Sequence, residues 1–181
     1  MARLNPINVD ALAGEQKRVY ELIMATRPHG LSGPFGVWVH NSRVAEPCEW
    51  LQNAFRLHSK LDRRLAELLV LLVAREYTAQ YAWYLHEKLA KKDGLDVRTI
   101  DAIRARQVPD ALRADEQIIY DVVSELLASK KISASTYERA VEALGLEVMV
   151  EVVTAVGFYG MACLTLNAFE VAVPEDASPL T

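Results

Sequence analysis

Two residues that could exchange a proton, a carboxylate and an imidazole, lie nineteen positions apart at Glu67 and His86. On one straight helix they would be ~28 Å apart, because each residue advances a helix by ~1.5 Å. A break at 76–77 would fold the chain back on itself, and Thr78 is a suitable N-cap for a second helix. In the resulting antiparallel helix pair the two side chains stand level and could act as a general acid and base.

The segment 61–90 must supply both helices of this pair. Residues 65–75 are apolar and helix-forming. Ser59 and Asp62 fit the two ends of a capping box in front of them, with Asp62 as the reciprocal acid. The second helix is predicted to end near Gly94, because glycine commonly terminates helices. The sequence therefore predicts an antiparallel helix pair at the centre of the fold.

The rest of the chain also shows helical patterns, and we expect an all-α protein with a single domain across residues 1–181. Its core should span about 15–170, between an N-terminal arm and a C-terminal tail. Residues 113–129 keep apolar side chains at helical spacing. Residues 146–170 are apolar nearly all round, which is typical of a helix buried on every side. In a chain of this size, such burial indicates contact with a partner subunit as well as with the chain's own core.

The composition limits the kinds of partner. The chain has 181 residues, 51% of them hydrophobic, so it can bury a core, and its formal net charge is −4. It has no dense run of Lys and Arg, so neither nucleic acid nor an anionic membrane is expected as a partner. It also lacks an uncharged run of 18 apolar residues and the apolar stretch of a signal peptide. We therefore expect a cytoplasmic protein without a transmembrane helix.

The cysteines and histidines form no local metal or redox motif. Cys48 and Cys163 lie 115 positions apart, which fits neither a disulfide framework nor a zinc site. The histidines are scattered, and the chain has no Gly-rich phosphate loop and no dinucleotide fingerprint. The sequence therefore predicts no metal site and no cofactor.

The block from Glu67 to His86 resembles the carboxymuconolactone decarboxylase family, which also holds the alkylhydroperoxidase-like thiol proteins. In the thiol branch, Glu is followed after eleven residues by Cys, after two more by a second Cys, and after three more by His. On this chain the Glu and the His fall on Glu67 and His86, whereas the two cysteine positions fall on Ala79 and Ala82. The decarboxylase branch tends to have Tyr-Glu-Trp before the His, and here residues 81–83 are Tyr-Ala-Trp.

Two further segments are similar to the family: Gly-Pro-Phe at 33–35 and Gly-Phe-Tyr at 157–159. The resemblance runs from about Arg3 to Pro174. It implies an alkylhydroperoxidase-like helical fold and a homo-oligomer, either a trimer or a hexamer.

For activity, the resemblance implies a cofactor-free lyase, or a related proton-transfer enzyme, that acts on a small acidic or lactone substrate with Glu67 and His86 as catalytic residues. Thiol peroxidase activity is not expected, because it needs an attacking and a resolving thiol where the chain has Ala79 and Ala82. The alternative is a non-catalytic oligomeric binding or scaffold protein, in which Glu67 and His86 only hold the helix pair together.

A small acidic substrate would need a cation and pocket walls. Arg75, near the predicted turn, is a candidate for binding the substrate's carboxylate, and Arg63 and Arg64 are others. The aromatic side chains near the pair could line a pocket or pack in the core. As further substrate-binding candidates we take Phe35, Tyr81 and Trp83.

Overall fold

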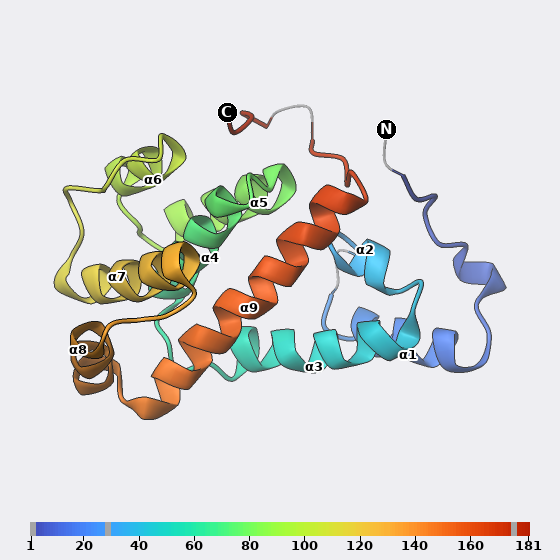
Figure 1. Ribbon diagram of the computed structural model, residues 1–181. Helices are drawn as coiled ribbons and strands as arrows, with labels where there is room; N and C mark the ends of the chain where they lie inside the picture. The colour runs from blue at the N-terminus through green and yellow to red at the C-terminus, as the bar shows by residue number, and fades with distance from the viewer. Residues whose placement is uncertain (1–2, 28–29, 175–176) are drawn as a thin grey trace.

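The computed structural model describes residues 3–27, 30–174 and 177–181, and within these ranges all regular secondary structure is helical (Figure 1). The all-α prediction is therefore confirmed for the described chain. A short 3₁₀ turn covers Val9–Ala11, and the α-helices are α1 Gly14–Met24, α2 Phe35–Trp38, α3 Ser42–Leu57, α4 Arg63–Glu76, α5 Gln80–Lys92, α6 Val97–Arg104, α7 Ala114–Ser129, α8 Ala134–Leu144 and α9 Leu146–Ala168.

The predicted helix pair is present as α4 and α5, joined by a tight turn at 77–79. Asp62 caps α4, because its side chain accepts a hydrogen bond from the backbone N–H of Arg64. Residues 67–75 are all buried, which makes α4 the central helix of the core. The chain reverses close to the predicted break, and this turn fixes α4 and α5 against each other.

Two predicted capping residues are wrong, although the helices themselves are present. Ala79, not Thr78, occupies the N-cap of α5. Thr78 instead adopts a left-handed conformation, with a φ of 47°, and its hydroxyl accepts a hydrogen bond from Arg106. Ser59 lies outside the N-terminal cap of α4, which Asp62 supplies alone. A tertiary contact thus decides the turn, rather than a local capping hydrogen bond.

Helix α9 crosses the molecule diagonally in Figure 1, with α4–α8 on one side and α1–α3 on the other. It packs against α4, α5, α7 and α8. From the other side, Trp38 of α2 and Phe55 of α3 make edge-to-face ring contacts with Phe158 of α9. Helix α9 therefore joins the two groups of helices through one continuous core.

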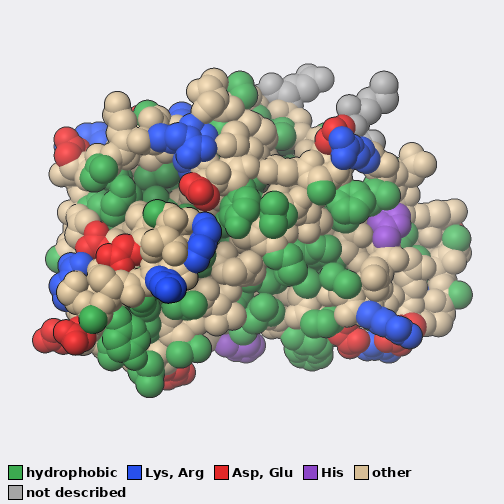
Figure 2. Space-filling view, viewed as in Figure 1, with side chains coloured by type: hydrophobic (Ala, Val, Ile, Leu, Met, Phe, Trp, Pro, Cys, Tyr) green, Lys and Arg blue, Asp and Glu red, His purple; other side chains and the backbone are tan. Residues whose placement is uncertain are grey.

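The expectation that α9 is buried on every side does not hold within the single chain. Apolar side chains at Leu146, Val150, Val153, Met161 and Leu164 are exposed, and Figure 2 shows hydrophobic side chains along this helix. By length and composition α9 could cross a membrane, but 44% of its most apolar window is buried inside the protein, a pattern that the core helix of a soluble protein also gives. The homo-oligomer remains a prediction.

Both ends of the described chain are attached to the helical body. The backbone of Arg3 donates to the carbonyl oxygen of Phe169, just after α9. The backbone N–H and C=O of Leu180 each bond to the side-chain amide of Gln80 at the start of α5. The N-terminal arm thus contacts the end of α9, and the C-terminal tail contacts α5. Residues 1–2 and 175–176 lie outside the described residues.

Candidate active site

Glu67 of α4 and His86 of α5 meet across the helix pair. His86 Nδ1 lies 2.6 Å from Glu67 Oε2, within hydrogen-bond distance. The two side chains are 15% and 9% exposed respectively. Because Nδ1 is engaged by Glu67, Nε2 is the ring nitrogen left for another partner. The predicted contact is therefore present, and the catalytic role of either residue remains a prediction.

A partly enclosed cavity of about 340 Å³ lies beside His86. It is bounded by α5, by α9, and by α2 and α3 with the loop that precedes them. Its volume is near the lower end of the ~300–1,000 Å³ that small-molecule sites occupy. The walls are mostly apolar and aromatic, with a few polar groups, and include Arg27, Phe35, Gln52, Arg56, Tyr81, Ala82, Leu85, Leu89, Phe158 and Tyr159.

Tyr159 of α9 stands edge-on to the imidazole of His86. The ring centroids are 5.6 Å apart and the ring planes meet at 84°. Burial, followed by the negative charge of Glu67, raises the pKa of Tyr159 to about 12. The phenol therefore stays protonated at neutral pH, and its hydroxyl can donate a hydrogen bond to an oxygen atom of a bound molecule.

Arg27 forms one wall of the cavity, and its charge is compensated. The guanidinium lies 3.8 Å from the centroid of the Phe35 ring and 2.8 Å from an oxygen of Glu49, which is fully buried. Its Nη2 donates to the side-chain oxygen of Gln52. Burial lowers the pKa of Arg27, and the Glu49 carboxylate opposes this effect. Arg27 is therefore held in place as half of an ion pair.

Arg56 is the cavity's cation without a compensating carboxylate. It is exposed and lies one helical turn after Gln52 on α3, and no ion pair joins its guanidinium to a carboxylate within the described chain. Its positive charge lowers the pKa of Tyr159 against the effect of burial, so it acts electrostatically at the ring beside His86. An arginine fork in this position suits the paired oxygens of a carboxylate.

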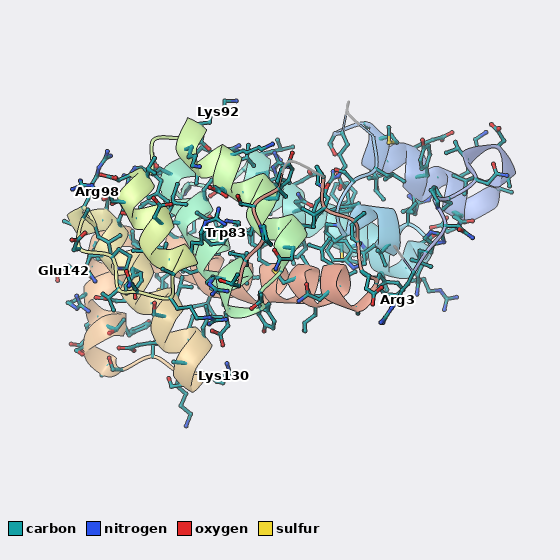
Figure 3. All side chains as sticks on the ribbon, turned by 90° about the horizontal axis from the view of Figure 1, so that it is seen from above. Arg3, Trp83, Lys92, Arg98, Lys130 and Glu142 are labelled. Carbon is teal, nitrogen blue, oxygen red and sulfur yellow. The ribbon has the colours of Figure 1, made fainter. Side chains whose placement is uncertain are left out.

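Three predicted site residues line the cavity: Phe35, Tyr81 and His86. Glu67 does not line it and is connected to it through its bond to His86. The placement of Trp83 was wrong. Its side chain is 1% exposed, its indole N–H donates to Glu87, and it lies within the helical body (Figure 3).

Arg75, the first candidate for binding a substrate carboxylate, does not line the cavity beside His86. Arg75 follows Glu67 by eight residues, which turns its side chain ~80° around α4 and carries it two turns along the helix. It lines a different cavity, formed with α6 and α7. Arg63 and Arg64 do not line the His86 cavity either: Arg63 donates to a backbone carbonyl of α3, and Arg64 pairs with acidic residues of α7.

The polar residues of the cavity that were not predicted include Arg27, Gln52, Arg56 and Tyr159. Tyr159 belongs to the segment 157–159, which had carried a family resemblance but no role. Arg56 shares a helix face with Gln52, four residues earlier, but this spacing alone does not show which helix that face will oppose. The sequence therefore contained a local pattern at Arg56 and at Tyr159, but it did not show which other helices these side chains would face.

Neither cysteine lies at the cavity, and within the described ranges no group of three or more His, Cys, Asp and Glu side chains could hold a metal ion. Cys48 and Cys163 are free and buried. Burial raises the pKa of both thiols, that of Cys163 to about 12. The positions that hold cysteines in the thiol proteins are occupied by Ala79 and Ala82, both buried.

We expect both cysteines to react slowly with an aromatic disulfide reagent at neutral pH while the protein is folded, because the reactive species is the thiolate. The release of the coloured thiol, followed over time, measures this reaction. The same protein in denaturant serves as the control and should react at the rate of an exposed thiol. Equal rates in the two conditions would contradict the prediction and would reopen the thiol peroxidase alternative.

Comparisons with known proteins bear on the fold. No family model matches the sequence, and no curated protein matches it. The structure is similar to the crystal structure of an uncharacterized peroxidase-related protein from Silicibacter sp. TM1040, with a TM-score of 0.76 and 15% sequence identity, over 97% of this chain and 93% of that chain. At this identity the likeness shows a shared fold, and it supports the all-α, alkylhydroperoxidase-like architecture expected from the sequence.

Proposed function

We propose that this chain is a carboxymuconolactone decarboxylase-like enzyme, which uses Glu67 and His86 to move a proton on a small acidic or lactone substrate. One observation carries the proposal: His86, held by Glu67, lines a partly enclosed cavity that Arg56 also lines. A proton-transfer group and a cation on different walls of one cavity suit a substrate that is anionic at one end and reacts at the other.

Substrate binding in this proposal depends on α3. Arg56 binds the carboxylate of the substrate through its guanidinium fork. Gln52, whose side-chain oxygen already accepts a bond from Arg27, has its amide N–H groups left to donate to the same carboxylate. The aromatic and aliphatic walls displace water from the rest of the molecule and thereby strengthen these polar contacts.

Proton transfer depends on the helix pair. When Nδ1 of His86 donates to Glu67, Nε2 is left as a base, and the carboxylate stabilises the imidazolium that forms when Nε2 takes a proton. In a decarboxylation, the C–C bond to the departing CO₂ breaks and its electron pair forms an enolate. His86, which has taken a proton at Nε2 from solvent, delivers that proton to the enolate carbon, while the hydroxyl of Tyr159 donates a hydrogen bond to the enolate oxygen.

The alternative is a non-catalytic binding or scaffold protein. The observation that favours it is the burial of the Glu67–His86 contact, because two nearly enclosed polar groups of facing helices also suit a structural role. In that case the cavity would bind small acids without converting them.

Incubation in D₂O with a panel of small acidic lactones and β-keto acids, followed by proton NMR, tests the proposal. Decarboxylation, lactone opening and deuterium incorporation at carbon are all visible in the same spectra. We expect at least one compound to exchange or react, and the reaction to be lost in the His86→Gln variant. Binding of these acids without any reaction or exchange would favour the scaffold alternative.

The Arg56→Gln variant is expected to raise KM by about 10- to 100-fold, which is the size expected for a lost charge-assisted hydrogen bond, with a smaller change in kcat. Arg43→Gln is the matched control, since Arg43 is an exposed arginine of the same helix and does not line the cavity. Steady-state kinetics on the compound found in the screen measures both. An unchanged KM in the Arg56 variant would remove this residue from substrate binding.

A further inference from the structure

Arg75 is a buried cation at the end of α4, and most of its guanidinium has no partner. The side chain is 6% exposed. Its Nη2 donates to the backbone oxygen of Thr181. Its Nε and Nη1 are shielded from solvent and make no hydrogen bond within the described chain. Buried charges are normally paired, and an unsatisfied buried polar group in a folded protein often marks the place of an ion or a water molecule.

Other cations surround this group. Burial first, and then the neighbouring guanidinium groups of Arg106 and Arg104, lower the pKa of Arg75. Arg104 is paired with Glu87. Arg106 donates to the backbone carbonyl of Arg75 at 3.2 Å, and the nearest carboxylate oxygen in its ion pair is at 3.9 Å, on Glu76. Within the described chain, Nε and Nη1 of Arg75 thus have no partner beside the contact of Nη2 with the last residue, Thr181, and Arg106 has only a distant carboxylate.

A cavity of about 200 Å³ lies at this place, between the ends of α4 and α6 and the middle of α7. It shares no lining residue with the cavity beside His86. Its lining includes one carboxylate, that of Glu76, and hydrogen-bond donors from two guanidinium groups, two hydroxyl groups and an amide. The donor residues are Arg75, Arg106, Tyr120, Ser124 and Gln107.

We infer that this second cavity binds a small oxyanion, a phosphate or a small carboxylate, with Arg75 and Arg106 as its cationic ligands. The planar fork of an arginine matches two oxygens of such an anion, and the hydroxyls of Tyr120 and Ser124 can bind the remaining oxygens. The volume suits an anion of a few non-hydrogen atoms. This site is independent of the reaction proposed for His86, because no residue is common to both.

The test is a titration with inorganic phosphate, and in parallel with acetate, at constant ionic strength maintained with chloride. Two signals are read: the thermal unfolding midpoint, and the NMR resonance of the arginine side-chain Nε–H groups, among which Arg75 should be protected from exchange. We expect a saturable rise of the midpoint and a saturable shift of the Arg75 resonance with at least one anion. The anion that produces these changes identifies the chemistry of the ligand. If neither anion gives a saturable response, the inference is overturned.

Variants locate the binding. Arg106→Gln changes an exposed residue, so the fold should persist, and we expect it to weaken anion binding at least 10-fold, as should Arg75→Gln. Arg98→Gln is the control for the loss of one positive charge at the surface. Arg98 lies at the periphery of the molecule (Figure 3), is largely exposed and pairs with Asp96. Arg56→Gln reports on the other cavity. If the response is lost in Arg56→Gln and kept in Arg106→Gln, the anion binds beside His86 and the inference is wrong.

Discussion

The His86→Gln variant is expected to lose about 10²- to 10⁴-fold in kcat on any compound that the wild-type protein converts, which is the usual contribution of a positioned general acid or base. Glutamine can still accept or donate a hydrogen bond to Glu67 across the helix pair, but it cannot carry a proton at neutral pH. The loss should therefore appear in kcat while the fold persists. Circular dichroism and the thermal unfolding midpoint verify the fold, and initial rates verify the loss.

His58→Gln is the matched control, because His58 is exposed at the end of α3 and lines no part of the cavity. The Glu67→Gln variant adds a second measurement: the amide cannot stabilise an imidazolium with a negative charge, so kcat should also fall, by a smaller factor than in the His86 variant. If Glu67→Gln is fully active, Glu67 takes no part in proton transfer. If His86→Gln is fully active, the acid–base mechanism fails as a whole.

The Arg64→Met variant is expected to lower the free energy of unfolding by about 3 kcal/mol, because it removes the closest cation from a buried carboxylate. The Arg64 side chain is 11% exposed and bonds to Asp115 and Glu116 at the start of α7. Glu116 is 1% exposed and also accepts the backbone N–H of Arg113. Methionine fills a similar volume but leaves the Glu116 carboxylate with only the longer ion pair to Arg113, at 4.0 Å.

Urea denaturation followed by circular dichroism measures this loss. Arg98→Met is the control, since Arg98 is 74% exposed and a surface ion pair contributes only about 0–1 kcal/mol. The double variant Arg64→Met/Glu116→Gln should recover part of the stability, because the carboxylate that lost its partner is then neutral. A loss below about 1 kcal/mol in Arg64→Met would show that solvent or neighbouring groups compensate the Glu116 charge.

The central helix pair could be predicted because its signals are local. The apolar run 65–75, a chain reversal close to Thr78 and the spacing from Glu67 to His86 together define one geometry, and the structure has that geometry. The details of the turn could not be predicted. Thr78 is held in a left-handed conformation beside Arg106, which lies 28 residues further along the chain, so the capping preference of threonine did not decide the helix start.

The full set of residues that line the cavity could not be predicted, because their positions depend on contacts between distant parts of the chain. Arg75 is close to the helix pair in sequence, yet it faces α6 and α7, whereas Arg56 is distant in sequence and lines the cavity. The position of Arg56 is set by how α3 packs against α9, through long-range aromatic contacts such as that of Phe55 with Phe158. A helical pattern shows which residues share a face, but it does not show which other face they will meet.

Ala82 lies one helical turn before His86 and lines the same cavity, and the native cysteines are buried elsewhere. The exchange Ala82→Cys would place a single cavity-facing sulfur one helical turn from His86, at a position whose native side chain is small. Disulfide trapping with a library of small thiol fragments would then select those whose shape and charge fit the space. The fragments that are captured would show which ligand shapes and charges the cavity binds, before any substrate has been found.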